Sequence, residues 1–107
     1  MAREQKPLII EWTETAEHQL FGILEYWNNH NKSTSYSEKL SELVWDRTNF
    51  IARNPDASPK TTFTETHKAA IGHFSVFYKV TDTKILITAF WDNRQDPKKL
   101  LDLLKQK

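Results

Sequence analysis

The fold is decided by Gly72-His73-Phe74-Ser75-Val76-Phe77-Tyr78-Lys79-Val80 and, after a short polar turn, by Ile85-Leu86-Ile87-Thr88-Ala89-Phe90-Trp91. Both stretches are rich in β-branched and aromatic residues, which predicts two paired strands. A charged loop closed by proline follows the second strand, Asp92-Asn93-Arg94-Gln95-Asp96-Pro97. Because binding and catalytic residues concentrate on loops that a rigid scaffold positions, this loop is where we look first for function.

The first half of the chain predicts one strand and two helices. Leu8–Trp12 is a short apolar run typical of a strand, and Thr13 is expected to cap a helix that reaches the turn residues Asn28–Asn31. Ser35, with Glu38 three residues later, forms a capping-box pattern for a second helix, which Asn54-Pro55 ends. The short loop between the helices predicts an antiparallel hairpin. The apolar spacing places on the inner face of the second helix Tyr36, Leu40, Leu43, Val44, Arg47, Phe50 and Ile51.

The segment between the helices and the strand pair predicts one further strand. Thr61–Thr66 has β-branched alternation, and Lys68–Ile71 is either its partner or its continuation. The element order is then β-α-α-β-β-β, which indicates an α+β fold in which the helical hairpin covers one face of an antiparallel-dominated sheet. At 107 residues the chain is expected to be a single domain, residues 1–107.

Regular alternation predicts which strand residues face the helices. Phe74, Val76, Tyr78 and Val80 share one face of their strand, and Ile85, Ile87, Ala89 and Trp91 share one face of the next. On the other face lie Phe77, Leu86 and Phe90, where no helix from the first half is available. A C-terminal helical tail over residues 98–107, with four leucines on one side, could fold back over that face. Otherwise a partner covers it, because contiguous exposed apolar surface commonly marks an interface.

Composition and charge exclude several classes of protein. No apolar run approaches the ~20 residues of a membrane span, and no apolar segment follows the first charged residues as in a signal peptide. The chain has no cysteine, which is compatible with a cytoplasmic location. Residues 1–54 hold 6 Lys/Arg and 8 Asp/Glu, whereas residues 55–107 hold 9 and 6. The basic half could attract phosphates or an acidic protein segment, although a merely solvated surface is the commoner cause of so small an imbalance.

The element order and the motif Trp91-Asp92-x-Arg94-Gln95-Asp96-Pro97-x-x-Leu100 resemble the RelE/ParE superfamily of bacterial type II toxin–antitoxin and plasmid-stabilisation systems. The likeness spans residues 8–100, and its specific motifs lie in the last third. The resemblance implies a small cytoplasmic toxin that inhibits growth and that a cognate antitoxin neutralises. It also implies one of two mechanisms. RelE-like members cut mRNA in the ribosomal A site, and ParE-like members act on DNA gyrase.

The residues of this chain favour the second mechanism. RNA cleavage needs an activated 2′-hydroxyl, a stabilised phosphorane and a protonated leaving oxygen. RelE-like nucleases usually carry an arginine where this chain has Ser75, and a Tyr or His beyond the last strand, where this chain has neither. We therefore expect a binding inhibitor with gyrase as its target. A ribonuclease that uses Arg94, Lys68 and His73 is the alternative from the enzyme class, and a non-toxic protein-binding module is the third.

Arg94 is the central candidate, either as a contact to the target through its planar fork or as a loop ion pair with Asp92 or Asp96. Lys98 and Lys99 are further candidates for target binding, and Phe77, Leu86 and Phe90 for antitoxin binding. His67, Lys68 and His73 flank a strand and are expected to be surface residues of a hairpin. Tyr78 is expected in the core with its hydroxyl at the edge. His18 and His30 lack partners at a recognisable ligand spacing, so we expect neither a metal site nor a cofactor.

Overall fold

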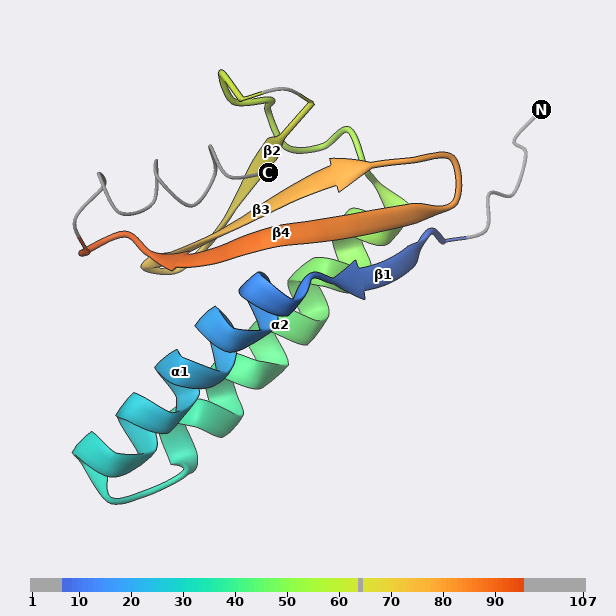
Figure 1. Ribbon diagram of the computed structural model, residues 1–107. Helices are drawn as coiled ribbons and strands as arrows, with labels where there is room; N and C mark the ends of the chain where they lie inside the picture. The colour runs from blue at the N-terminus through green and yellow to red at the C-terminus, as the bar shows by residue number, and fades with distance from the viewer. Residues whose placement is uncertain (1–6, 64, 96–107) are drawn as a thin grey trace.

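A helical hairpin packs against one face of a mixed four-stranded sheet in the computed structural model of the chain, which describes residues 7–63 and 65–95 (Figure 1). The elements, in chain order, are β1 (Ile9–Trp12), α1 (Glu14–Asn31), α2 (Ser35–Arg53), β2 (His67–Ile71), β3 (Phe74–Val80) and β4 (Lys84–Asp92). The strands lie in the order β1-β4-β3-β2, with β1 parallel to β4 and the other pairs antiparallel. The predicted α+β fold and its β-α-α-β-β-β order are confirmed.

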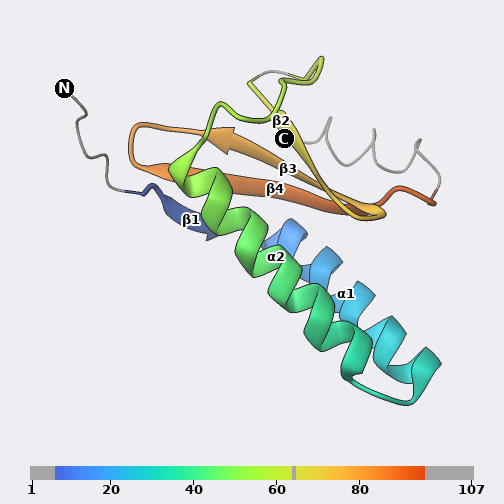
Figure 2. The same cartoon turned by 180° about the vertical axis from the view of Figure 1, so that it is seen from behind.

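The two helices begin differently. Thr13 caps α1 as predicted, because its Oγ1 accepts a hydrogen bond from the backbone N–H of Ala16 at 3.2 Å. The cap of α2 is Thr34 rather than Ser35, and the Thr34 hydroxyl donates to the Glu38 carboxylate at 2.8 Å instead of binding the helix backbone. Figure 2 shows the hairpin from behind, with its loop end extending beyond the sheet.

The buried face of α2 is rotated by about one position from the predicted one. The buried residues of α2 are Ser37, Leu40, Val44, Thr48, Ile51 and Ala52, whereas Leu43 and Phe50 are about half exposed and Arg47 is exposed. Two residues with hydroxyl side chains allow this face of α2 to be buried. Ser37 donates to the carbonyl of Leu24 at 2.9 Å, and Thr48 donates to the carbonyl of Trp45 at 3.1 Å, so both polar side chains are satisfied when buried.

The predicted strand Thr61–Thr66 is wrong. The described residues there form a turn in which the Thr61 hydroxyl donates to the carbonyl of Thr66 at 3.0 Å and accepts from the backbone N–H of Phe63. Threonine hydroxyls compete in this way with ladder hydrogen bonds, which periodicity does not register. The second strand in chain order is therefore β2, which begins at His67 and pairs with β3.

A β-bulge in β4 changes the two faces of the sheet. Phe77 lies opposite Ala89, and Tyr78 lies opposite Ile87, so Thr88 is an extra residue in β4. After Thr88, the residues of β4 therefore face the opposite sides of the sheet from those that regular alternation predicts. Phe90 is fully buried on the helix side, where it stacks on Phe74 with ring centroids 5.5 Å apart.

The same bulge moves Ala89 and Trp91 to the opposite face. There they form a second buried cluster with Phe77, against which Phe63 packs. The predictions that Phe90 faces away from the helices and that Ala89 and Trp91 face them are therefore wrong. Phe77 is 3% exposed and Leu86 is half-buried, so Phe77, Leu86 and Phe90 do not form one exposed apolar patch.

The predicted tail helix over residues 98–107, with Lys98 and Lys99, lies outside the described residues. None of the helices that the structure describes combines the length and apolar character needed to cross a membrane.

Candidate functional site

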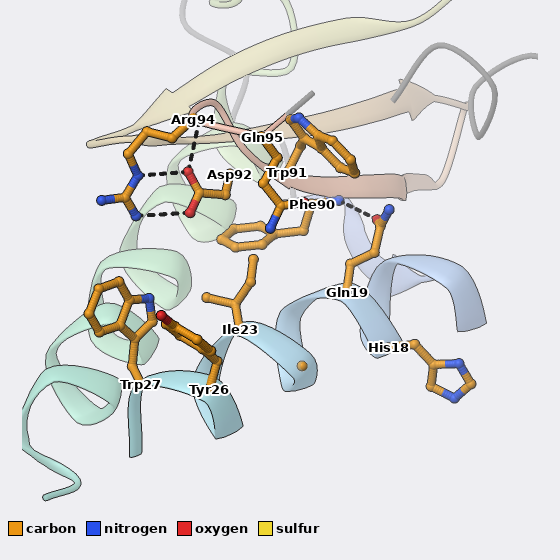
Figure 3. Close-up of a pocket in the computed structure, with 11 residues that line it drawn as sticks. His18, Gln19, Ile23, Tyr26, Trp27, Phe90, Trp91, Asp92, Arg94 and Gln95 are labelled. Atoms are coloured by element: carbon orange, nitrogen blue, oxygen red, sulfur yellow. Dashed lines mark hydrogen bonds and ion pairs between the residues drawn. The ribbon is translucent and has the colours of Figure 1, made fainter. Parts of the chain in front are cut away.

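A cleft of about 690 Å³ separates the middle of α1 from the end of β4 and the loop that follows it (Figure 3). It is lined on the α1 side by His18, Gln19, Gly22, Ile23, Tyr26 and Trp27, and on the β4 side by Phe90, Trp91, Asp92, Arg94 and Gln95. The loop predicted to carry function thus borders this cleft.

Arg94 is held by Asp92 through both carboxylate oxygens. Its Nε donates to Oδ1 at 2.9 Å, its Nη2 donates to Oδ2 at 2.8 Å, and its backbone N–H also donates to Oδ1. The guanidinium carbon lies 5.8 Å from the ring centroid of Trp27 and 5.9 Å from that of Phe74, both within cation–π range. The loop ion pair that the sequence allowed is therefore formed, and its partner is Asp92.

The ion pair leaves Arg94 able to bind a second group. Two side-chain N–H donors of the five are used by Asp92, and the side chain is 49% exposed, against 13% for Asp92. The hydrogen bonds from Arg94 lower the pKa of the Asp92 carboxyl, and the same bonds raise the pKa of the Arg94 guanidinium. Arg94 is thus a fixed cation at the mouth of the cleft, positioned to meet a carboxylate or a phosphate.

Gln19 is a cleft residue that sequence reasoning missed. Its Oε1 accepts a hydrogen bond from the backbone N–H of Phe90 at 2.8 Å, and its Nε2 is buried with no partner among the described residues. β1 ends at Trp12, opposite Ile87, so the N–H of Phe90 lies beyond the last strand partner on that edge. No sequence signal could have located Gln19, because its role depends on where β1 stops and on the bulge.

The three candidates for nuclease chemistry are only partly brought together. The carbonyl of His73 accepts from the backbone N–H of Asn93 at 2.9 Å, which places the β2–β3 turn beside the Arg94 loop. Lys68 is separated from the end of β2 by about 10 Å of strand, at ~3.3 Å per residue. Arg94 and His73 therefore share one end of the sheet, whereas Lys68 does not belong to that group.

Ser75 and Tyr78 have structural roles. Ser75 is fully buried, and its hydroxyl donates to the side-chain carbonyl of Asn93 at 2.8 Å. Tyr78 is in the core, as predicted, and its hydroxyl donates to the carbonyl of Pro55 at 3.2 Å. Burial raises the pKa of the Tyr78 phenol. His67, predicted at the surface, is buried against the Tyr78 ring at a centroid distance of 5.0 Å.

Residues 7–63 and 65–95 contain no group of three or more His, Cys, Asp or Glu side chains that could hold a metal ion.

Comparisons with known proteins identify the family of the chain. No curated protein matches the sequence. A solved structure titled "Chromosomal ParDE TA system from P. aeruginosa" is similar with a TM-score of 0.67, covering 78% of this chain and 92% of that one at 15% identity, which shows a shared fold. The family model of the ParE toxin of the type II toxin–antitoxin system parDE matches residues 10–97, most of the chain. The chain therefore belongs to the ParE toxin family of type II toxin–antitoxin systems.

Proposed function

We propose that this toxin arrests growth by binding DNA gyrase rather than by cutting mRNA, and that a cognate antitoxin neutralises it. The observation that carries the proposal is the state of the residues around Arg94. The carboxylate nearest to Arg94 is Asp92, which is held ionised by that arginine, and the position of the nuclease arginine is occupied by the buried Ser75. This arrangement supplies a recognition surface with a fixed cation and aromatic walls.

The chemistry of RNA cleavage fits these residues less well. A general acid must release a proton near neutral pH, but a carboxyl group with a lowered pKa has none to give. The ion pair with Asp92 also offsets part of the Arg94 charge that a nuclease would need to stabilise the phosphorane. One observation favours the ribonuclease as a second candidate, namely that the turn containing the exposed His73 lies beside the Arg94 loop.

Supercoiling by purified gyrase, primer extension on mRNA in a translating extract, and colony counts after induction test the proposal together. Arg94→Ala is expected to reduce inhibition of supercoiling and to relieve growth arrest, while the melting temperature stays within a few degrees of wild type. Arg94→Lys should restore activity only in part, because an ammonium is a point donor and cannot reproduce the guanidinium fork.

Lys60→Ala is the matched control. Lys60 is also an exposed, ion-paired cation, 3.1 Å from Glu65, but it does not line the cleft. This variant should keep full activity. Codon-phased mRNA cleavage that Arg94→Ala abolishes, with supercoiling untouched, would replace gyrase binding by the nuclease mechanism. Full toxicity of a stable Arg94→Ala protein would remove Arg94 from the site.

Co-expression with the adjacent gene tests the antitoxin. We expect the partner to raise the yield of soluble toxin and to restore colony formation. The absence of growth arrest in the native host, at confirmed expression of soluble protein, would instead support a binding module without toxicity.

A further inference from the structure

A second groove, of about 240 Å³, lies between α1 and α2 and reaches Trp12 of β1. Its lining comes from both helices and is mostly apolar: Trp12, Glu17, Leu20, Phe21, Leu24, Ser41, Val44, Trp45 and Thr48. It shares no lining residue with the Arg94 cleft, which lies along another face of α1. This groove and its rim are therefore a separate surface of the molecule.

Two aromatic side chains of the groove are exposed to solvent. Phe21 on α1 is 58% exposed, and Trp45 on α2 is 68% exposed. Large aromatics with this exposure bury considerable apolar area when a partner covers them, and tryptophan is the residue type most enriched at energetically dominant interface positions. The pair supplies two apolar anchors on the two sides of one groove.

The rim of this groove carries charge of one sign. Residues three, four or seven positions apart lie on the same side of a helix. At such distances from Phe21 lie Glu14, Glu17 and Glu25, and at such distances from Trp45 lie Glu38 and Glu42. No lysine or arginine occupies any of these positions, and the one histidine among them is His18.

The five glutamates are exposed, and none of them forms an ion pair within the described part of the chain. The opposite flank of α2 is different. Leu43 and Phe50 are also about half exposed there, but the charged residues that line the hollow with them are one acid and one base, Asp46 and Arg47. Exposed apolar residues are thus found on both flanks of α2, whereas a rim that carries only negative charge is found at the Phe21–Trp45 groove.

We propose that the Phe21–Trp45 groove docks a cationic amphipathic segment of a partner protein, with apolar side chains between Phe21 and Trp45 and Lys or Arg side chains against the glutamate rim. From Glu14 to Glu25 the α1 side of the rim extends about 16 Å, which matches about three turns of a bound helix. Nucleic acid and anionic membrane are disfavoured as occupants, since both carry the charge of the rim. The inference does not depend on the proposed function.

Calorimetry with model peptides tests it. The probe is a helical Leu/Lys peptide of about 14 residues, and its counterpart replaces every Lys by Glu at the same length. The full chain should bind the cationic peptide and not the anionic one, and the affinity should fall as salt shortens the Debye length from about 10 Å at 0.1 M to about 3 Å at 1 M. Trp45→Ala should weaken binding about 30-fold or more, as truncation of a central aromatic anchor does.

The double charge reversal Glu17→Lys/Glu42→Lys should weaken binding of the cationic peptide at least about tenfold and create binding of the anionic one. Leu43→Ala/Phe50→Ala is the matched control on the other flank and should leave both results unchanged. Since all of these side chains are exposed, the melting temperatures should stay close to wild type, and the charge reversal still decides the case if Trp45→Ala fails to fold.

Two outcomes would overturn the proposal. One is equal binding of both peptides, or binding that the groove variants do not affect. The other is self-association of the peptide-free chain in sedimentation that Trp45→Ala abolishes, because the groove would then belong to a second copy. Loss of gyrase inhibition or of toxicity is not a readout here, so failure of the gyrase proposal leaves this test intact.

Discussion

At the scale of single residues, the Asp92–Arg94 pair predicts a specific response to acid. The pKa of Asp92 is lower in the folded chain than its usual value of about 3.9, so the pair stabilises the fold fully above about pH 4 and the contribution is lost as the pH falls through the folded pKa. Asp92→Asn should therefore melt below wild type near neutral pH, and the difference should close in acid. Thermal melts between about pH 7 and pH 2 check this. A difference that is constant with pH would mean that the carboxylate charge contributes nothing.

Ser75 gives a second prediction at this scale. Introducing the arginine of the nuclease members, Ser75→Arg, should cost about 3–5 kcal/mol, since the site is fully buried and the hydrogen-bond partner of Ser75 is the uncharged amide of Asn93. Ser75→Ala, the control, loses the hydrogen bond to Asn93 and should cost about 1 kcal/mol. Chemical denaturation measures both. A Ser75→Arg protein as stable as wild type that cleaves mRNA would show that one residue separates the two mechanisms.

At the scale of elements, the bulge in β4 sets what the cleft contains. Deleting Thr88 should remove the bulge and restore plain alternation while leaving Phe90 on the helix side and Trp91 on the opposite side, because the residues before and after position 88 keep their partners in β3. Loss of a buried Phe from a core costs ~3–5 kcal/mol, and because this deletion keeps Phe90 buried we expect it to cost less than that and to leave the chain folded. Circular dichroism and urea denaturation give the result.

Thr88→Val is the matched control, because it keeps the chain length and removes only the hydroxyl that donates to the carbonyl of Phe77 at 3.3 Å. It should cost about 1 kcal/mol. A deletion that unfolds the chain would contradict the expectation that it stays folded and would show that the extra residue itself is required for the geometry of β4.

Helix α2 and strand β4 show how much of the structure could be predicted from the sequence. Apolar periodicity found both helices, β1, β3 and β4, and the charge-rich loop pointed to the cleft. It missed the phase of α2, because Ser37 and Thr48 are polar by type and are buried only through hydrogen bonds to the backbone. It also missed the bulge and with it Gln19, because a two-residue alternation contains no information on where one strand gains a residue over its neighbour.

At the scale of the whole molecule, the central position of β4 predicts how the chain folds. β4 lies between β1 and β3 and also packs against α1, so segments from both ends of the chain meet on it. A fragment that ends at Val80 should lack cooperative unfolding, because β1 has no other strand partner and the core loses Ile85, Ile87 and Phe90. Urea titration of the fragment beside the full chain measures this. A sigmoidal transition with an m-value near that of the full chain would contradict it.

The bulge at Thr88 also affects how relatives of this chain should be compared. A relative without the extra residue would have a β4 that is one residue shorter, with the aromatic residues before the loop still on the same faces of the sheet. A sequence alignment without a gap at position 88 would then equate a residue of the core with one of the second face. Inherited site assignments beyond this strand are therefore sound only between family members whose strands contain the same number of residues between the tight turn and the Arg94 loop.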